Sequence, residues 1–133
     1  MKLITRDTDY AIRALCCIAE KKNAIVTVDE LVKDLKIPRP FLRKLLQILN
    51  KKNIVHSYKG KGGGFTLSIL PSKLSLFDII VAFQGSIQLN DHTFKKRSCP
   101  HIKNCKTKKK LDRIEKIMIT ELKAITINSI IKN

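Results

Sequence analysis

The first part of the chain alternates between short amphipathic stretches and breaks. Apolar residues recur at spacings of three and four over residues 9–20, which predicts a first helix with Thr5 as its N-terminal cap. Thr27 and Glu30 form a capping-box pattern and predict a second helix. The Ile-Pro-Arg-Pro sequence of residues 37–40 must end that helix, because proline lacks a backbone donor and disfavours helical geometry in the residue before it. A third helix therefore starts there, with a predicted inner face of Phe41, Leu42, Leu45, Leu46 and Leu49.

Two short helices separated by a tight turn, the second of them basic, are typical of a helix-turn-helix. The pattern then changes its period. Residues 54–58 alternate between apolar and polar side chains, residues 59–64 form a basic, glycine-rich turn, and residues 65–68 alternate again. This arrangement predicts a β-hairpin with a basic tip, which is the wing of a winged helix.

The second part of the chain is predicted to contain two more helices. Ser75 and Asp78 form a second capping box, which opens a helix that ends near Gly85. Residues 90–110 are polar and rich in lysine, and we expect a long loop there. In the helix beyond it, apolar residues form a narrow seam with no partner left in so small a domain, so a second copy of the chain is the predicted partner. The seam consists of Leu111, Ile114, Met118, Leu122 and Ile125.

Together these elements predict a mainly α fold (α+β). We expect a winged helix-turn-helix DNA-binding domain over residues 1–85 and a cysteine-containing sensor loop over residues 86–110. A long dimerisation helix with a C-terminal tail is expected over residues 111–133.

The charge of the chain indicates its partner. The 133 residues include 27 Lys and Arg against 11 Asp and Glu, a formal net charge of +16. Such an excess of one sign is tolerated best beside an anionic partner, and nucleic acid is the expected one. No apolar run approaches the roughly 18 residues of a membrane-spanning helix, and the amino end lacks a secretory signal pattern, so we expect a cytoplasmic protein without a membrane partner. An enzyme is not expected, because no nucleophile, base and orienting group recur together.

Basic residues mark two candidate DNA contacts. The start of the second helix of a helix-turn-helix enters the major groove, so Arg39, Arg43 and Lys44 are predicted to reach base edges or phosphates. At the hairpin tip Lys59 and Lys61 flank Gly60 and are predicted to approach a phosphate or a narrow minor groove. The alternative for an isolated basic helix is a solvated surface. A nucleotide-binding glycine loop is not favoured, because a strand and not a helix follows the turn.

Three blocks of sequence resemble a known family of regulators in their order and spacing. They are Thr8–Leu15, Gly60–Leu67 and Leu74–Ile80, and they are similar to the IscR/NsrR/RirA group, the Rrf2 family, over essentially the whole chain. The resemblance implies a homodimeric winged-helix transcription factor with a long dimerisation helix. It also implies that a loop before that helix often holds an iron-sulfur cluster. By the same resemblance, recognition-helix contacts fall on Pro40, Arg43 and Lys44, and a wing contact on Lys59.

The resemblance leaves the cofactor open. Cluster-bearing members supply three cysteines from the loop, and this chain keeps only the second and third, while some members add an aspartate from the other subunit. One interpretation is a cluster held by Cys99, Cys105, Asp9 and His92. Of equal standing is a loop that holds no metal, and zinc on His92, Cys99, His101 and Cys105 ranks behind both.

The sequence therefore predicts a homodimeric DNA-binding transcriptional regulator that reads a pseudo-palindromic operator in double-stranded DNA. A bound cluster would make it responsive to redox state, iron or nitric oxide. The alternative is a cluster-free regulator or interaction module that acts through a partner protein as co-regulator.

Overall fold

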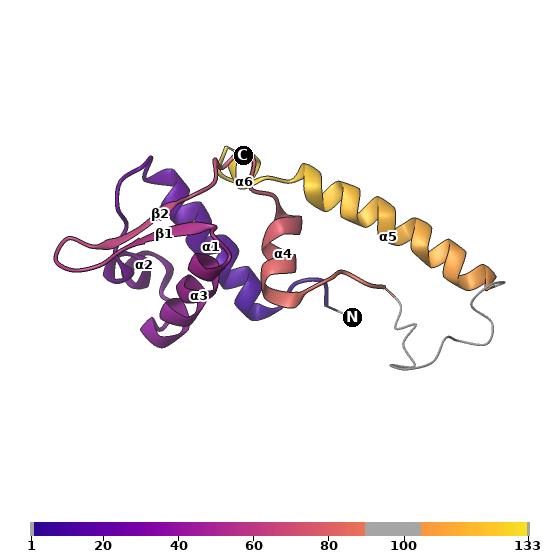
Figure 1. Ribbon diagram of the computed structural model, residues 1–133, viewed down its shortest axis with the longest axis horizontal. Coiled ribbons are helices and arrows are strands. Elements are labelled where there is room, and N and C mark those ends of the chain that lie inside the picture. Colours follow the sequence, from indigo (N-terminus) through magenta and orange to yellow (C-terminus); the bar gives the residue numbers. More distant parts are fainter. Residues whose placement is uncertain (1, 90–104, 133) are drawn as a thin grey trace.

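The computed structural model describes residues 2–89 and 105–132. It confirms the predicted fold, a mainly helical winged helix with a two-stranded antiparallel sheet and a long C-terminal helix (Figure 1). Figure 1 shows the hairpin tip at one end of the molecule and the start of α5 towards the other. The elements are α1 (Arg6–Glu20), α2 (Val28–Leu35), α3 (Arg39–Lys51), β1 (Val55–Tyr58), β2 (Gly64–Leu67), α4 (Leu76–Gln84), α5 (Lys106–Ala124) and α6 (Ile127–Ile131).

The helices begin where the capping patterns predict. Thr5 accepts a hydrogen bond from the backbone N–H of Thr8 at 3.3 Å, and Thr27 accepts one from Glu30 at 3.1 Å. Ser75 and Asp78 complete a capping box, in which each side chain accepts from the backbone N–H of the other residue. Such caps satisfy backbone donors that the first turn of a helix leaves free. Three of the predicted helix starts are therefore confirmed.

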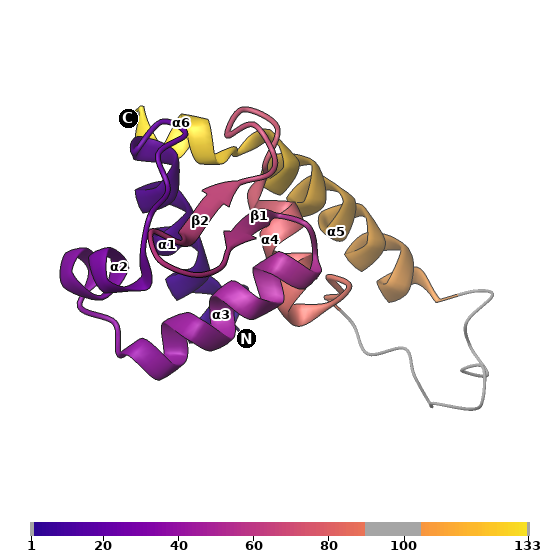
Figure 2. The ribbon, with the colours of Figure 1, turned by 60° about the vertical axis from the view of Figure 1, so that its left-hand side comes forward.

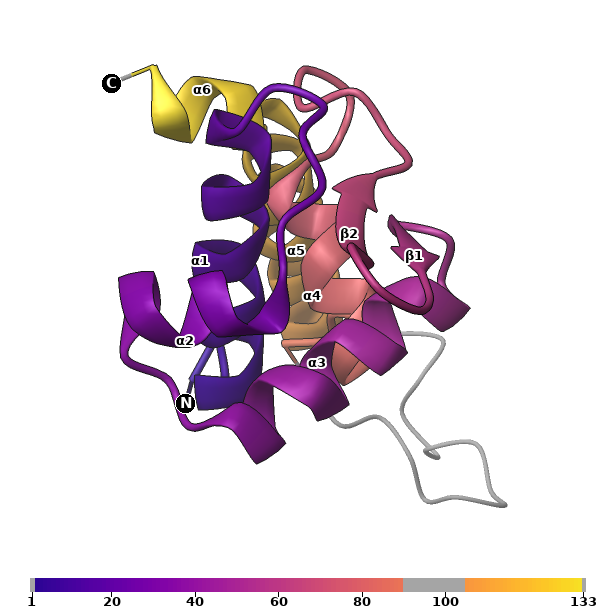
Figure 3. The ribbon, with the colours of Figure 1, turned by 90° about the vertical axis from the view of Figure 1, so that its left-hand side faces the viewer.

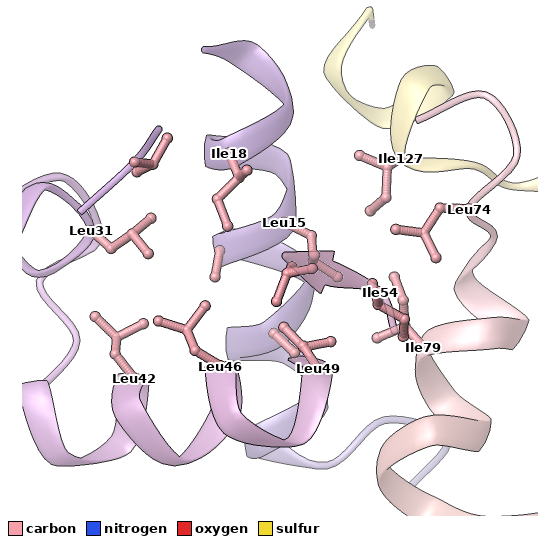
Figure 4. Packing of buried hydrophobic residues seen from close by; sticks show 14 of the residues in the cluster. Leu15, Ile18, Leu31, Leu42, Leu46, Leu49, Ile54, Leu74, Ile79 and Ile127 are labelled. Carbon is pink, nitrogen blue, oxygen red and sulfur yellow. The ribbon is translucent and has the colours of Figure 1, made fainter. Parts of the chain in front are cut away.

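The core lies where α1, α3 and α4 meet. Leu42, Leu45, Leu46 and Leu49 of α3 are fully buried, and Figure 4 shows three of them pointing towards Leu15 and Ile18 of α1 and Ile54 before β1. Burial of a leucine side chain stabilises the folded chain by about 1.5 to 3 kcal/mol. These contacts fix the rotation of α3 about its own axis, and so decide which of its residues face outwards.

Phe41 was predicted on the inner face of α3, and this prediction is wrong. Its side chain is 39% exposed, and its ring lies 5.3 Å from the guanidinium carbon of Arg6. Adjacent helical residues point about 100° apart, so Phe41 lies well away from Leu42 and just outside the arc that the buried leucines fill. For an apolar residue at the edge of a helical stripe, spacing alone does not show whether the side chain is buried or exposed.

The hairpin is attached to the rest of the domain. Val55 pairs with Leu67 and Tyr58 with Gly64, which gives the register of the two strands. A third segment joins β2, because Val26 and Phe65 exchange both backbone hydrogen bonds at 2.9 and 2.8 Å. A Cβ atom on Gly64 would lie 2.5 Å from the carbonyl oxygen of Val26, so only glycine fits here. The base of the wing is thus fixed to the connection between α1 and α2.

Gln84 at the end of α4 joins that helix to the start of α1. Its side-chain oxygen accepts from the hydroxyl of Thr8 at 2.7 Å and from the backbone N–H of Thr5 at 3.0 Å. Its side-chain nitrogen donates to the carbonyl of Leu3 at 3.0 Å. Thr8 is fully buried, so the bond to Gln84 satisfies a hydroxyl that would otherwise be costly to bury. The first turn of α1 is held in place by this network.

The carboxyl-terminal third of the chain differs from prediction at two points. The long helix begins at Lys106, so residues 106–110 are helical although a loop was predicted over 90–110. The thiol of Cys105 accepts from the backbone N–H of Lys108 at 3.3 Å and caps the helix. The spacing of apolar residues carries no information about such a cap, so the helix start was missed. The chain then forms α6, which was predicted only as a tail and which packs against α1.

Residues 125–128 return to the domain that was predicted to end at residue 85. Ile127 is fully buried in the main core, and its N–H donates to the carbonyl of Leu74 at 2.9 Å. Leu76 donates in turn to the carbonyl of Ile125 at 2.9 Å. The winged helix is therefore completed by residues from the far end of the chain. The helix α5 lies between α4 and α6 in the sequence and is inserted into this domain.

Ile127→Ala tests whether this segment belongs to the core. We expect a loss of about 2 to 5 kcal/mol in the free energy of unfolding, because the substitution leaves a cavity at a fully buried site. Ile25→Ala removes the same atoms at a position that is 40% exposed, and it should cost less than about 1 kcal/mol. Urea titrations followed by circular dichroism at one protein concentration provide both values. Equal losses in the two variants would contradict the assignment of α6 to the core.

Candidate nucleic-acid interface

The turn between α2 and α3 has the geometry of a helix-turn-helix. Lys36 ends α2 in the left-handed region, at φ 55°, and its N–H donates to the carbonyl of Val32 at 2.9 Å. Pro38 precedes α3 and Pro40 lies in its first turn, where the missing N–H of proline costs nothing. Three residues therefore connect the two helices, and α3 starts below α2 in the view of Figure 3.

The outward face of α3 is polar and cationic. Pro40, Arg43, Lys44, Gln47 and Lys51 recur at spacings of three and four, and all of them are exposed. They lie opposite the buried leucines. Within residues 2–89 and 105–132, neither Arg43 nor Lys44 forms an ion pair. Both are therefore available to an external anion.

Arg39 is held differently from the other predicted contacts on α3. Its guanidinium forms an ion pair with the carboxylate of Asp29 on α2. The pair is more than a third exposed, so its contribution to stability is small, but it turns the side chain towards α2. Arg39 would have to leave this carboxylate, or share it, in order to reach DNA.

The wing carries the second group of predicted contacts. Lys59, Gly60 and Lys61 are exposed at the tip, and a backbone hydrogen bond of 3.0 Å from Gly63 to Gly60 closes the turn. Gly60 has φ 87°, a conformation that other residues rarely adopt. His56 is an exposed residue of β1, and its ring lies 5.9 Å from that of Tyr58.

The two groups form one cationic surface. Residues 39–61 contain seven basic residues, Arg39, Arg43, Lys44, Lys51, Lys52, Lys59 and Lys61, and no Asp or Glu. Figures 2 and 3 show that α3 and the hairpin are neighbours, with α5 on the far side of the domain. Within the described residues, the carboxylate paired with this group is Asp29 of α2, which engages Arg39. A mainly cationic surface suits a polyanion such as duplex DNA.

The predicted metal ligands are only partly within the described residues. His92, Cys99 and His101 lie outside them. The carboxylate of Asp9 is paired with Arg13 Nε at 3.0 Å, which raises the pKa of that guanidinium. Cys105 is the cap of α5. Across residues 2–89 and 105–132, no group of three or more His, Cys, Asp or Glu side chains could hold a metal ion.

Cys16 and Cys17 are not part of a site in this structure. Both are free thiols that pack, partly buried, against the core. Burial raises the pKa of both thiols. The nearby Glu20 carboxylate adds to the effect at Cys16, and Asp34 adds to it at Cys17. A raised pKa leaves little thiolate at neutral pH, so these cysteines are poor nucleophiles.

The predicted dimerisation seam divides between two surfaces. Leu122 is buried and Leu111 and Met118 are half-buried, on the side of α5 that packs against α4, so the helix does have a partner within the chain. Ile114 and Ile125 remain 53% and 38% exposed. The pattern missed Ile117, which is 55% exposed beside Ile114. The exposed apolar surface of α5 is therefore narrower than the seam and displaced around the helix.

Comparison with known proteins identifies the family. A family model for Rrf2, described as iron-dependent transcriptional regulator, matches residues 4–133. The chain belongs to the Rrf2 family. Its members are transcriptional regulators and not enzymes, and DNA binding is the function that the family implies.

Individual relatives agree with this assignment. A relative from Aquifex aeolicus is 45% identical over 74 residues, which are 56% of this chain and about half, 51%, of that protein. The HTH-type transcriptional regulator NsrR of Bacillus licheniformis is 27% identical over 135 aligned positions, covering 100% of this chain and 94% of that one. The solved structure of CymR, the global cysteine regulator of B. subtilis, superposes with a TM-score of 0.80 at 19% identity over 99% of this chain and 98% of that one, and shows the shared fold.

The part of the chain that the structure describes was also searched for membrane spans. None of its helices combines the length and the apolar character that crossing a bilayer requires.

Proposed function

We propose that this Rrf2-family regulator binds double-stranded DNA as a homodimer, with the outward face of α3 in the major groove and the wing on the flanking backbone. Both parts of this interface come from residues 39–67 of the chain. Two copies related by a two-fold axis would read a pseudo-palindromic operator.

The observation that carries the proposal is the cationic surface of α3 and the wing. Arg43 and Lys44 are exposed beside Pro40 and have no ion pair among the described side chains, and residues 39–61 contain no carboxylate that would repel phosphate. Arg43 has the fork of donors that suits a guanine edge, and Lys59 provides a point charge suited to a phosphate. Specificity is thus expected from α3, and a sequence-independent part of the affinity from the wing.

The dimer is supported by the exposed apolar surface of α5. Ile114 and Ile117 are more than half exposed, and Ile125 extends the surface towards α6. Side chains of this size gain free energy when a second copy covers them. The half-buried and buried members of the predicted seam, Leu111, Met118 and Leu122, would then hold α5 against its own α4.

The sensing role rests on the cysteine-containing loop. A cluster held there would provide a centre that reacts to redox state, iron or nitric oxide. Ligation by Asp9 would have to break its ion pair with Arg13, and ligation by Cys105 would compete with its role as the cap of α5. Both contacts oppose ligation, so these two residues favour the metal-free loop, and a cofactor measurement tests the cluster against it.

Arg43→Ala and Lys59→Ala test the two DNA contacts. We expect Arg43→Ala to relax the preference at one base position by about 1 to 3 kcal/mol, because a bidentate contact to a base edge is lost. Lys59→Ala should weaken binding to all sequences alike. It should also reduce the salt slope, the steepness with which the logarithm of the binding constant falls with the logarithm of salt concentration, by about 1. Selection from a random duplex pool, followed by binding titrations at several salt concentrations, measures both effects.

Lys73→Ala removes an exposed lysine outside this surface and should change neither property. Uniform losses in both test variants would contradict the separate roles of α3 and the wing. Binding that requires a second protein would favour the co-regulator alternative.

A double substitution, Ile114→Glu with Ile117→Glu, tests the dimer. It places two carboxylates in the apolar surface of α5, and we expect sedimentation velocity to show a shift from dimer to monomer. Leu70→Glu introduces the same charge at a side chain that is 62% exposed and lies outside α5, so it should leave the dimer intact. A wild-type protein that sediments as a monomer would refute the proposed dimer.

Anaerobic purification with iron and sulfide analysis tests the loop. We expect Cys105→Ala to abolish any bound iron and sulfide together with the visible absorption, because a thiolate ligand is removed. Cys17→Ala is the matched control, since that thiol lies on α1 and should not affect iron content. A colourless, iron-free wild-type protein would support the metal-free loop, and equal iron loss in both variants would contradict the assignment of Cys105.

A further inference from the structure

The exposed ring of Phe41 and the side chain of Arg6 form a structure that the interface described so far does not use. The guanidinium carbon of Arg6 lies 5.3 Å from the centre of the Phe41 ring. We propose that Arg6, seated on Phe41, is a further DNA contact that binds a backbone phosphate beside the groove entered by α3. This proposal rests on the proposed DNA binding and extends the interface from α3 and the wing to the start of α1.

The backbone that carries Arg6 is fixed. Arg6 is the first residue of α1, directly after the cap Thr5, whose backbone N–H donates to Gln84 at 3.0 Å. The next turn is held by the hydroxyl of the buried Thr8, which donates to the same Gln84 oxygen at 2.7 Å. A side chain on such a base loses little additional freedom on binding, and preorganisation of this kind raises affinity.

The ring of Phe41 positions the guanidinium. Phe41 lies in the first turn of α3 next to Pro40, and 39% of its surface is exposed although an apolar side chain gains nothing from water there. The face of an aromatic ring carries partial negative charge and attracts a cation placed above it. The ring therefore holds Arg6 next to the start of α3, and this contact explains why an aromatic residue occupies an exposed position.

The charge of Arg6 remains available to an external anion. Arg6 forms no ion pair within the described residues, in contrast to Arg39, which is paired with Asp29. The nearby carboxylate of Asp9 is compensated by Arg13 at 3.0 Å. Asp7 follows Arg6 directly, but adjacent helical side chains point about 100° apart, and Asp7 is half-buried while Arg6 is exposed.

Phosphate is the ligand that fits this position better than a base edge. Phe41 is on the flank of α3 and not on the stripe of Pro40, Lys44 and Gln47 that points away from the core, and Arg6 reaches that flank from another helix. Figure 3 shows the first turns of α1 and α3 at the same end of the domain. Groups that flank a recognition helix meet the sugar-phosphate backbone, and a guanidinium can bind two phosphate oxygens at once.

The test compares four variants on a random-sequence duplex and on a duplex enriched from a random pool. We expect Arg6→Gln to weaken binding to both duplexes about equally and to reduce the salt slope by about 1, the loss of one phosphate contact. Phe41→Leu should weaken binding in the same direction and have no further effect in an Arg6→Gln background, because it acts through Arg6. Phe41→Tyr keeps the ring and should retain the wild-type affinity and slope.

Lys73→Gln is the matched control, since it removes an exposed cation that forms no ion pair among the described side chains and lies outside this surface. Circular dichroism melts identify any variant that fails to fold. A salt slope for Arg6→Gln that equals those of wild type and Lys73→Gln, while Arg43→Ala still alters binding, would overturn this inference and leave the proposed function standing. If the wild-type protein binds neither duplex, the proposed function itself fails.

Discussion

The burial of four leucines on one side of α3 is the constraint on which the proposed interface depends. Leu42, Leu45, Leu46 and Leu49 have no exposed surface, so α3 cannot rotate about its axis without opening the core. The rest of the helix surface is fixed as a consequence. Arg43 and Lys44 face solvent because the leucines occupy the buried side of the helix. The orientation of the proposed binding residues is thus set by the packing of other residues.

This arrangement concentrates like charge on a small domain. The seven basic residues between 39 and 61 lie on α3, on the turn after it and on the wing, and their mutual repulsion opposes folding. Within the described residues, one of the seven, Arg39, has an ion pair, with Asp29 on α2. The other carboxylates of α2 that form ion pairs, Glu30 and Asp34, lie 3.7 and 3.5 Å from Lys21, which directly follows α1. The pairs hold α2 among its neighbours, while the charges proposed for DNA are left uncompensated.

Much of the fold could be predicted from the sequence because its signals are local. Proline at 38 and 40, the caps at Thr5, Thr27 and Ser75, and the basic glycine turn each specify the backbone within a few residues. The errors arise where a distant partner decides. Phe41 follows the apolar spacing, but its exposed ring contacts the guanidinium of Arg6. The predicted seam on α5 is divided because one side of that helix packs against α4. The start of α6 is fixed by hydrogen bonds to the carbonyls of Leu74 and Pro71. The candidate DNA contacts were predictable as exposed cations, whereas the ion pair of Arg39 was not.

The short bridge between Val26 and Phe65 has a consequence for the thermodynamics of recognition. A two-stranded ribbon is marginally stable by itself in water, and a free ribbon would lose its flexibility only when it met the duplex. Here the third segment imposes that loss when the chain folds, so the entropic penalty is absent from the association step. In the proposed complex, the base of the wing would therefore be positioned beside α3 before the duplex binds, because the Val26–Phe65 bridge and the hydrogen bond from Ile54 to Leu49 already hold it.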